Sequence, residues 1–541
     1  MYEEARLYAA ALRKFGLKKG DVVACYMSNR IEAVIAMLSV TSIGAIFTGA
    51  LPQLGPQAVI SRFQIVKPKL LFSVDRYRNN NEEIEMLMKL EEIAEALPSL
   101  RKIVIVPSKE ESKFKDISKI KNSCFLHDFL STGREADGSV APTMFEQVSF
   151  SHPVFINYTS GTTGLPKALF VGAASLLSVT RDFGSYGNEV RERVWFSVSP
   201  VGWVTWNIFS SMHFLGCTVV LFEGVPYFLS KTSLWDLIDE FKVTHIVLPP
   251  SILDDMEKKG YLPTERNSLS SLETIISAGS VVKPQNYDFV CNKIKKGILF
   301  FSGFGCTELM GFSAGHDPSL PVYRGELTAP SLGTDLQCLD EEGKPVIGEA
   351  GEMVIAKPFP SLVLGIWGDS DGSVFKEKYF SKFPGKFSIG DLVVINPVTR
   401  GFIVCGRSDA TLKPGGCRFG SSEIYNIVES FPEILDSICV SQYSKDLVER
   451  AVLFLKMKDG YYFSEELVNR IREKIGEELT VHHIPEVILE IQDIPVNANG
   501  KKMELTVKQI INNLPYNSES VMNPECLQCF HNVPELQGFE C

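Results

Sequence analysis

Short apolar runs alternate with amphipathic segments along the first half of the chain. The runs include "DVVACYM", "KIVIVP", "TVVLFEG" and "HIVLPP", and helical patterns such as Ser233–Phe241 separate them. Runs that are apolar at nearly every position are typical of parallel strands buried on both faces, which crossover helices connect. The pattern therefore predicts a large α/β unit with mostly parallel sheets, covering residues 1–409.

The N-terminal stretch "MYEEARLYAAALRKFGLKKG" has no apolar signal core. Its apolar positions Leu7, Ala11, Leu12 and Phe15 recur at helical spacing, and Gly16 follows them. This pattern predicts an amphipathic helix that ends at Gly16, and nothing in it indicates export.

A longer uncharged segment runs from Ala33 to Ser61 and is long enough to span a bilayer. Glycines and Pro52 divide it into a helix, a short strand and a turn, as expected of elements inside a parallel sheet. We therefore expect no membrane insertion, with a membrane-associated protein as the alternative.

The pattern changes after Gly351. The runs "GEMVIAKP", "GDLVVINP" and "GFIVCGRSD" have Gly and Pro punctuation without a long helix between them, which predicts a smaller antiparallel section. From Ser421 the order is helix, strand, helix, beginning with "SSEIYNIVESF" and an N-terminal Ser cap. We expect a small α+β C-terminal domain over residues 410–514, mobile relative to the first, and a polar, irregular tail over residues 515–541.

Composition narrows the classes of function. The 541 residues exceed the size at which a single core keeps growing, and the net charge of -11 argues against an extended nucleic-acid surface. The twelve cysteines show no disulfide framework, and runs such as that around Cys25 resemble reduced core thiols, so we expect a cytosolic protein. Cys526, Cys529 and His531 offer three potential metal ligands without a visible fourth, and their role stays open.

The segment "YTSGTTGLPKA" carries the clearest chemical signal. Its hydroxyls, its glycine N–H groups and Lys167 can surround phosphate oxygens. The spacing does not match the P-loop, and on composition alone a plain Gly/Thr turn is an equal alternative.

The chain resembles the adenylate-forming superfamily, which includes acyl-CoA synthetases, through five motifs in order. These are "YTSGTTGLPKA", "GFGCTEL", "SIGD", "CGRSDATLKPGGCRFGSSEI" and "NANGKK". Within the superfamily it is most similar to the acetoacetate:CoA ligases, through strings such as "VGWVTWN", "SLPVYRGEL", "KYFSKFPG" and the terminal "VPELQGF". Such enzymes normally carry about a hundred further N-terminal residues, a size typical of a subdomain, so we expect an N-terminally short form. Val171 stands where they usually have a His.

The resemblance implies an ATP-dependent ligase that converts acetoacetate to acetoacetyl-AMP and then to acetoacetyl-CoA, with Mg2+ as cofactor and ATP and CoA as co-substrates. An ionised carboxylate is already a nucleophile, so this chemistry needs charge neutralisation and in-line positioning rather than a protein base. By resemblance, the catalytic residues are Lys501, Glu308 as the Mg2+ ligand, and Thr307. The ATP and AMP contacts would be Thr159, Ser160, Gly161, Thr162, Thr163, Lys167, Gly279, Ser280, Phe304, Asp391, Arg407 and Arg418.

Three further assignments follow from the same resemblance. Gly416 would let the backbone approach the pantetheine of CoA, and Asp409 would be the hinge between the domains. The acyl pocket would be formed by Val204, Thr205, Ala278 and Gly305. Because acetyl-selective relatives place a Trp at the position of Gly305, we expect the glycine to leave room for acetoacetate, with Thr205 donating to its ketone.

Two alternatives remain open. The chain could be a synthetase for acetate, propionate or another short acid, or an inactive homologue that binds ATP without turnover. A panel of short carboxylates in an ATP–pyrophosphate exchange assay separates these alternatives.

Overall fold

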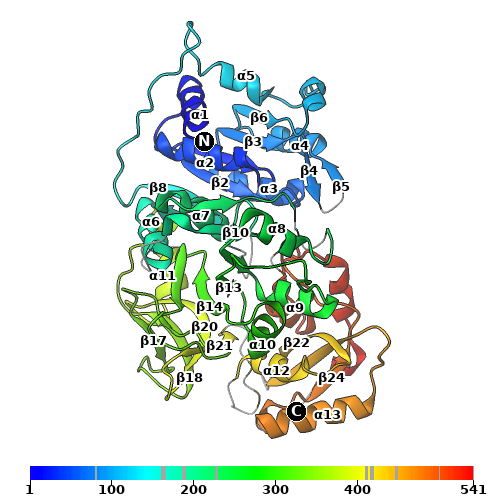
Figure 1. Cartoon of the computed structure of the whole chain (residues 1–541). Helices are drawn as coiled ribbons and strands as arrows, with labels where there is room; N and C mark the ends of the chain where they lie inside the picture. Colours follow the sequence, from blue (N-terminus) through cyan, green and yellow to red (C-terminus); the bar gives the residue numbers. More distant parts are fainter. Residues whose placement is uncertain are drawn as a thin grey trace.

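The structure is a computed structural model of the whole chain (Figure 1). It describes residues 1–79, 82–159, 166–184, 190–224, 226, 229–408, 412, 414, 419–444, 449–479, 481–498 and 500–539.

An eight-stranded sheet dominates the N-terminal part of the chain. Its strands are parallel except for the pairs β8–β9 and β9–β19. In spatial order they are β19 (Gly365–Ile366), β9 (Lys167–Gly172), β8 (Pro153–Thr159), β2 (Ile46–Ala50), β1 (Val22–Tyr26), β3 (Leu70–Val74), β6 (Lys102–Val106) and β7 (Ser123–Phe125). A separate hairpin joins β4 (Arg76–Asn79) and β5 (Glu82–Glu85).

A seven-stranded sheet follows in the chain. From β11 to β14 the neighbours are parallel, and the last two strands are antiparallel. In spatial order they are β11 (Thr218–Val220), β10 (Val194–Ser197), β12 (His245–Leu248), β13 (Thr274–Ala278), β14 (Leu299–Cys306), β15 (Gly311–Gly315) and β16 (Ala329–Pro330). The predicted class, α/β with mostly parallel sheets, is confirmed.

Helices cover these sheets and cross over between parallel strands. They are α1 (Tyr2–Lys14), α2 (Ile31–Ser42), α3 (Pro56–Val66), α4 (Leu87–Ala96), α5 (Leu126–Ser131), α6 (Leu176–Val179), α7 (Val204–Ser210), α8 (Ser233–Phe241), α9 (Pro250–Lys259) and α10 (Pro284–Phe289). The uncharged segment Ala33–Ser61 contains most of α2, all of β2 and the start of α3, so its predicted helix and strand are confirmed, while its last residues begin a further helix. Among the described residues, no helix is long and apolar enough to cross a membrane.

The predicted antiparallel section is a four-stranded sheet of β17 (Leu336–Leu339), β18 (Ala350–Ile355), β20 (Phe387–Ile395) and β21 (Phe402–Arg407). Helix α11 (Ser373–Phe380) precedes β20 and packs against it. This sheet lies at the lower left of Figure 1, with the C-terminal elements beside it.

The C-terminal elements form a smaller sheet with its own helices. They are α12 (Ser421–Val428), β22 (Ile434–Tyr443), β23 (Glu449–Met457), α13 (Glu465–Glu478), β24 (Val487–Glu490) and α14 (Glu504–Ile511). The predicted Ser cap of the first helix is wrong. The cap residue is Gly420, whose N–H donates to Glu423 Oε1 (2.9 Å), and Ser421 is the first helical residue.

The tail after Leu514 differs from its prediction as a polar, irregular segment. It forms two short 3-10 helices, Pro524–Phe530 and Pro534–Leu536. Leu527, Phe530 and Leu536 are buried there and pack with apolar residues of the C-terminal sheet, because widely spaced apolar side chains can fill a core without a helical repeat.

The buried apolar clusters separate along the chain. Two large clusters belong to the two parallel sheets and another to the antiparallel sheet, and all of their members precede residue 408. Two more contain only residues that follow residue 411. Among the described residues, no buried apolar cluster joins these two parts, which is the expected condition for parts that move relative to each other.

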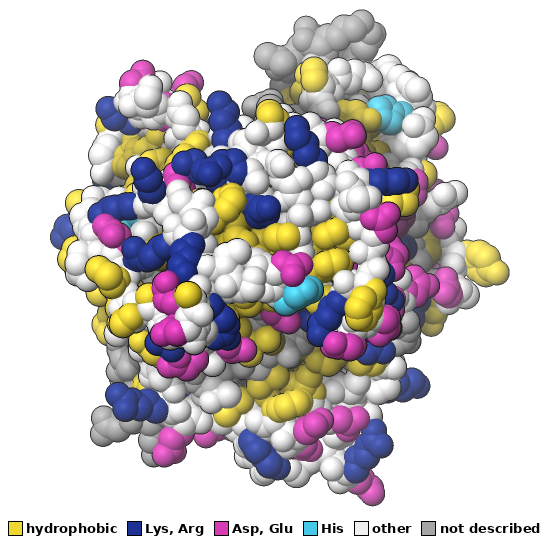
Figure 2. Space-filling model, turned by 90° about the horizontal axis from the view of Figure 1, so that it is seen from above, with side chains coloured by type: hydrophobic (Ala, Val, Ile, Leu, Met, Phe, Trp, Pro, Cys, Tyr) yellow, Lys and Arg dark blue, Asp and Glu magenta, His cyan; other side chains and the backbone are white. Residues whose placement is uncertain are grey.

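On the face in Figure 2, basic and acidic side chains are interspersed. The β4–β5 hairpin shows the same mixture at residue level, where Arg76 pairs with Glu83 (2.9 Å) and Lys109 pairs with the same carboxylate (2.5 Å). Surface ion pairs of this kind contribute little to the stability of the fold. Because they mix both charges, they prevent an extended surface of one charge.

Candidate active site

The two ends of the Gly/Thr loop lie opposite each other in the first sheet. Thr159 ends β8 and pairs with Lys167, the first residue of β9, in the antiparallel register. The Thr159 hydroxyl is buried and has no hydrogen-bond partner among the residues that the structure describes. A buried hydroxyl without a partner indicates a missing water or ligand group. Ser160, Gly161, Thr162 and Thr163 lie outside the described residues.

The carboxyl ends of β13 and β14 lie side by side, as adjacent parallel strands require. Ala278 pairs with Gly303, so that Gly279 and Ser280 follow one strand end while Phe304 continues the other. Gly279 has φ +101, a left-handed conformation that favours glycine. Ligands of α/β proteins bind in the crevice outside such strand ends, which is where these sequence-predicted residues meet.

A tight hairpin at the end of β14 carries Thr307 and Glu308. Its strands are joined by the pair Cys306 and Gly311. Glu308 is only 8% exposed, and its Oε1 accepts a hydrogen bond from the Tyr379 hydroxyl (2.8 Å). The ammonium of Lys378 lies 3.8 Å from the same oxygen. Helix α11 thus brings a donor and a positive charge to a largely buried carboxylate.

The predicted ribose ligand, Asp391, lies in the same region. It sits on β20, which contacts α11 through stacking of Tyr379 on Phe387 (4.8 Å). Burial raises the pKa of the Cys306 thiol, and the Glu308 and Asp391 carboxylates raise it further, so both act on one thiol. Tyr379 contacts Glu308 and stacks on Phe387 of the strand that carries Asp391, so the two carboxylates lie on elements that pack together beside the β14–β15 hairpin.

Asp391 lies opposite Arg407, another residue predicted for this site. It is the cross-strand partner of Arg407 on β21, whose side chain lies outside the described residues. Asp409, Gly416 and Arg418 lie outside the described residues as well. The structure therefore brings the backbone of Arg407 to the site, and the remaining hinge-motif assignments stay predictions.

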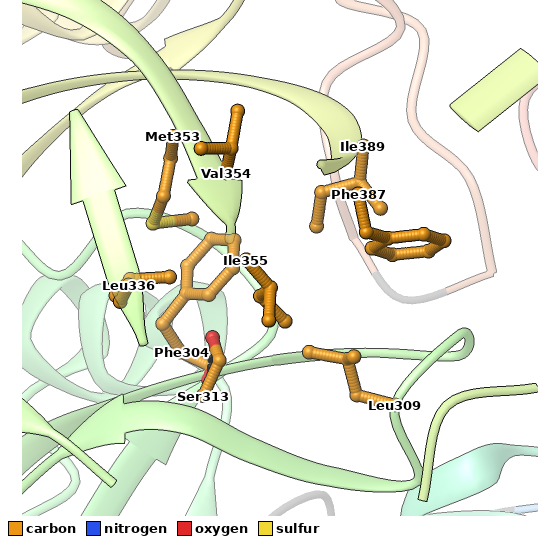
Figure 3. Close-up of a pocket in the computed structure, with 9 residues that line it drawn as sticks. All are labelled: Phe304, Leu309, Ser313, Leu336, Met353, Val354, Ile355, Phe387 and Ile389. Atoms are coloured by element: carbon orange, nitrogen blue, oxygen red, sulfur yellow. Dashed lines mark hydrogen bonds between the residues drawn. The ribbon is translucent and has the colours of Figure 1, made fainter. Parts of the chain in front are cut away.

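The Phe304 ring lies against the antiparallel sheet. Figure 3 shows its ring pointing into a small apolar cavity, where Leu336, Met353 and Ile355 of the antiparallel sheet lie around it. One side of the ring is thus engaged in packing between β14 and the β17–β18–β20 strands. Stacking on adenine, expected from the sequence, stays a prediction for this partly exposed ring.

Asp182 and Arg181 clamp the backbone of β15. Asp182 Oδ2 accepts from the Phe312 N–H (2.7 Å), Arg181 donates to the Phe312 carbonyl (2.6 Å), and the two side chains pair with each other (2.6 Å). Burial raises the pKa of Asp182, and Arg181 only partly offsets this. The clamp fixes the second strand of the hairpin that presents Glu308.

Gly305 stands where two strands approach each other closely. A Cβ at this position would collide with the Gly311 carbonyl and lie 3.1 Å from the Phe312 ring. The backbone of β15 therefore occupies the place where a side chain would begin, and the expectation that the missing side chain enlarges the acyl pocket stays a prediction. The glycine permits the close approach of two strands.

Val204 and Thr205 begin helix α7, just after β10 and its loop. The Thr205 hydroxyl lies 2.5 Å from the Ser199 hydroxyl, and either oxygen can be the donor. If Ser199 donates, the Thr205 proton is available to a ligand. The membership of Val204, Thr205, Ala278 and Gly305 in one acyl pocket stays a prediction.

Lys501 lies in a turn of the C-terminal part. Its N–H donates to Asn497 Oδ1 (3.0 Å), and the bridge between Val496 and Lys502 closes the turn. The side chain is exposed and has no ion pair with any residue that the structure describes. The arrangement thus presents Lys501 to solvent, whereas its neighbour Lys502 is paired.

The sequence interpretation had assigned no role to two residues of this site, Tyr379 and Asp182. Tyr379 was part of the family-like string "KYFSKFPG", and that string was the only signal that could have pointed to it. Asp182 had no signal, because its role depends on contact with a backbone 130 residues away.

The structure also tests candidate metal ligands. Glu308 supplies a hard carboxylate oxygen of the type that Mg2+ prefers. Within the described part of the chain, no group of three His, Cys, Asp or Glu residues could hold a metal ion. His531 Nε2 lies 3.1 Å from the Tyr516 hydroxyl, and Cys529 Sγ lies 4.0 Å from Gln492 Oε1, so both side chains have protein neighbours in this structure.

Known proteins share this arrangement of sequence and fold. The family model described as "AMP-binding enzyme" matches residues 1–367. An acetoacetyl-CoA synthetase of Gallus gallus is 44% identical, covering 99% of this chain and 81% of that protein. An acetoacetyl-coenzyme A synthetase of Rhizobium meliloti is 34% identical, covering 98% and 80%. The solved acetoacetyl-CoA synthetase from Streptomyces lividans superposes with a TM-score of 0.87 at 30% identity, covering 98% and 81%.

Proposed function

The chain belongs to the AMP-binding enzyme family, among the acetoacetyl-CoA synthetases, and we propose that it joins acetoacetate to CoA using ATP. It is an acid–thiol ligase of the AMP-forming type. The observation that carries the chemistry is the packing together, beside the β14–β15 hairpin, of the elements that carry Glu308 and Asp391. The choice of acid rests on the names of its relatives.

The first half-reaction forms acetoacetyl-AMP. A carboxylate oxygen of acetoacetate attacks the α-phosphorus of ATP, and the bond to pyrophosphate breaks. Thr159 and Lys167 face each other across the β8–β9 register, so their hydroxyl and ammonium can hold the leaving phosphates. We assign the loop residues Ser160, Gly161, Thr162 and Thr163 to the same phosphates, and Thr307 to the α-phosphate.

The nucleoside is assigned to the strand ends of the second sheet. We propose that Gly279, Ser280 and Phe304 border the adenine. The two oxygens of Asp391 can accept from both ribose hydroxyls, and Arg407 and Arg418 would pair with the ribose and phosphate.

Glu308 is the residue that would hold Mg2+. A bound Mg2+ would neutralise negative charge on the phosphate oxygens. The Tyr379 hydroxyl fixes the carboxylate by donating to Oε1, and its ring is itself held by stacking on Phe387. Tyr379 is therefore a positioning residue for the metal ligand.

Tyr379→Phe is expected to raise the Mg2+ concentration needed for half-maximal adenylate formation by about tenfold, since partners of metal ligands typically contribute this much. The stacking survives the change, so the melting temperature without ligand should shift little. The Mg2+ dependence of ATP-induced thermal stabilisation gives an independent readout. An unchanged Mg2+ dependence in both assays would show that the hydroxyl has no positioning role.

The second half-reaction transfers the acyl group. The CoA sulfur attacks the acyl carbon of acetoacetyl-AMP, the bond to AMP breaks, and the thiol proton leaves to solvent. We propose that Gly416 borders the pantetheine, and that the residues 410–514 turn about Asp409 as a domain distinct from residues 1–409, with residues 515–541 attached to it. The separation of the apolar clusters supports this division.

Thr205 is our candidate for recognising the ketone of acetoacetate. Thr205→Val keeps the volume and removes the hydroxyl, so the preference for acetoacetate over butyrate should fall about tenfold, the size of one ordinary hydrogen bond. The ratio of kcat/KM values for the two acids measures it. Ser199→Ala is the matched control, since it removes the neighbouring hydroxyl (2.5 Å) and leaves that of Thr205. An unchanged ratio in Thr205→Val would place ketone recognition elsewhere.

Product analysis tests the proposed reaction. With acetoacetate, ATP, Mg2+ and CoA, equal amounts of AMP, pyrophosphate and acetoacetyl-CoA should form, and ADP or free phosphate would indicate another chemistry. We propose the cytosol as the compartment, because the cysteines that the structure describes are all free thiols.

A further inference from the structure

A cluster of partly buried charges lies where the C-terminal elements meet helices α9 and α10. It contains two lysines and three carboxylates from separate segments of the chain. Lys283 caps the N-terminus of α10, Asp254 lies on α9, Glu429 caps the C-terminus of α12, Asp436 lies on β22, and Lys502 closes the turn of Lys501.

Glu429 is the centre of the cluster. Its Oε2 accepts from Lys283, and its Oε1 accepts from Lys502. Lys283 also pairs with Asp254 (3.2 Å), and Lys502 pairs with Asp436 (2.7 Å). The Glu429 side chain is only 9% exposed, and each lysine is 18% exposed. Each of the two lysines therefore contacts two carboxylates.

Glu429, Lys283 and Lys502 are held in their charged forms. Burial opposes the charged forms, raising the pKa of Glu429 and lowering those of Lys283 and Lys502. The opposite charges beside each group outweigh burial, so the pKa of Glu429 is depressed well below its usual range and those of both lysines are raised.

These charges join the part of the chain before residue 408 to the part after residue 411, across the boundary between them. The two parts share no buried apolar cluster among the described residues. Other contacts across this boundary are also polar, since Lys258 donates to the Leu435 carbonyl and Gln285 donates to the Asn426 carbonyl (3.1 Å). Figure 1 shows α9 and α10 beside α12 and β22. Polar and charged groups, rather than a common core, therefore hold this part of the boundary.

The cluster divides at the boundary into two groups that stay internally paired. Asp254 keeps Lys283 on one side, and Glu429 and Asp436 keep Lys502 on the other. Removing one member of a buried ion pair leaves an uncompensated charge, which is strongly destabilising. Separation of the two groups avoids that cost, because no ion loses every partner. Such a contact is suited to repeated docking and release.

The C-terminal group also fixes the turn of Lys501. Lys502 is held by Glu429 and Asp436 and by the Ser437 carbonyl, while the adjacent Lys501 is exposed. A Cβ on Gly500 would lie 3.1 Å from Ser251 Oγ at the start of α9, so the turn lies close to this helix. With the cluster intact, Lys501 faces solvent.

We propose that Lys283 and Asp254 form a docking site for the Glu429–Lys502 pair, which holds the Lys501 turn on α9 and α10 and must be released before Lys501 can act on ATP. The docking site itself follows from these contacts. The consequence for Lys501 rests on the proposed function.

Small-angle X-ray scattering of the full ligand-free chain tests the docking site. Lys283→Met removes the charge that crosses the boundary, so we expect a larger radius of gyration and a longer tail in the distance distribution. Glu429→Gln should act in the same way, and the double variant should open the molecule no further than either single variant, because both changes break one contact.

Lys293→Met is the matched control, since Lys293 is exposed in the segment that follows α10 and its scattering should match the wild type. Circular dichroism verifies folding. If Lys283→Met fails to fold, Lys283→Gln keeps a donor and removes the charge, and the same opening is expected. Unchanged scattering of a folded Lys283 variant, or equal opening in Lys293→Met, overturns the docking site.

The half-reactions test the consequence for Lys501. In the Lys283 variant, thioester formation from supplied acetoacetyl-AMP should fall relative to adenylate formation. Equal changes in both rates contradict the link to Lys501. A wild type without any activity refutes the proposed function instead, and leaves the scattering result as it stands.

Discussion

Lys501→Ala is expected to slow adenylate formation by about 10²–10³-fold, the usual effect of removing one electrostatic group that acts in the transition state. The ammonium would neutralise charge that develops as pyrophosphate leaves. Transfer of the acyl group from supplied acetoacetyl-AMP to CoA releases AMP and no pyrophosphate. This step should therefore proceed at close to the wild-type rate. ATP–pyrophosphate exchange measures the first step, and thioester formation measures the second.

Because Lys501 is exposed, Lys501→Ala should change the reaction without disturbing the fold. Its side chain makes no ion pair within the described part of the chain, so alanine should not destabilise the fold. Lys458→Ala, in an exposed turn after β23, is the matched control and should change neither step. Equal losses in both half-reactions of Lys501→Ala would refute the assignment.

Glu308→Gln is expected to lower adenylate formation by a similar factor of about 10²–10³. The amide keeps the size of the side chain and can still accept from the Tyr379 hydroxyl, but it loses the charge that a metal ligand needs. Raising the Mg2+ concentration should restore part of the rate. The measurement is the exchange rate as a function of Mg2+.

Glu342→Gln, in the exposed turn between β17 and β18, serves as the control for Glu308→Gln. A Glu308→Gln enzyme that keeps the wild-type rate and Mg2+ dependence would exclude Glu308 as the metal ligand. A large fall in melting temperature would instead assign the carboxylate a structural role.

Elements with a strong local pattern were predicted well from the sequence. Helix α8 has the predicted bounds Ser233–Phe241, because its apolar positions repeat at helical spacing. Strand β22 was missed, since Asp436, Ser437 and Ser441 interrupt its apolar character. The cap of α12 was misassigned because the cap residue is Gly420, which has no side chain that the sequence could reveal as a cap. Its backbone N–H makes the hydrogen bond, to Glu423 Oε1.

The candidate site was predictable only as far as its motifs extend. Resemblance selected Glu308 and Asp391, and the structure places them on elements that pack together. It could not reveal the contact of Tyr379 with Glu308, or the pairing of Lys283 with Glu429, because these contacts join segments 71 and 146 residues apart. The close approach of β15 to Gly305 could not be predicted for the same reason, since the two strands meet only in the folded hairpin.

The most direct measurement is ATP–pyrophosphate exchange by the full chain with acetoacetate, acetate, propionate and butyrate in turn. We predict that acetoacetate supports the fastest exchange, and that omission of Mg2+ abolishes it. Exchange with acetate or butyrate at least as fast as with acetoacetate would contradict the substrate, and ATP binding without exchange for any of the four acids would contradict the ligase itself.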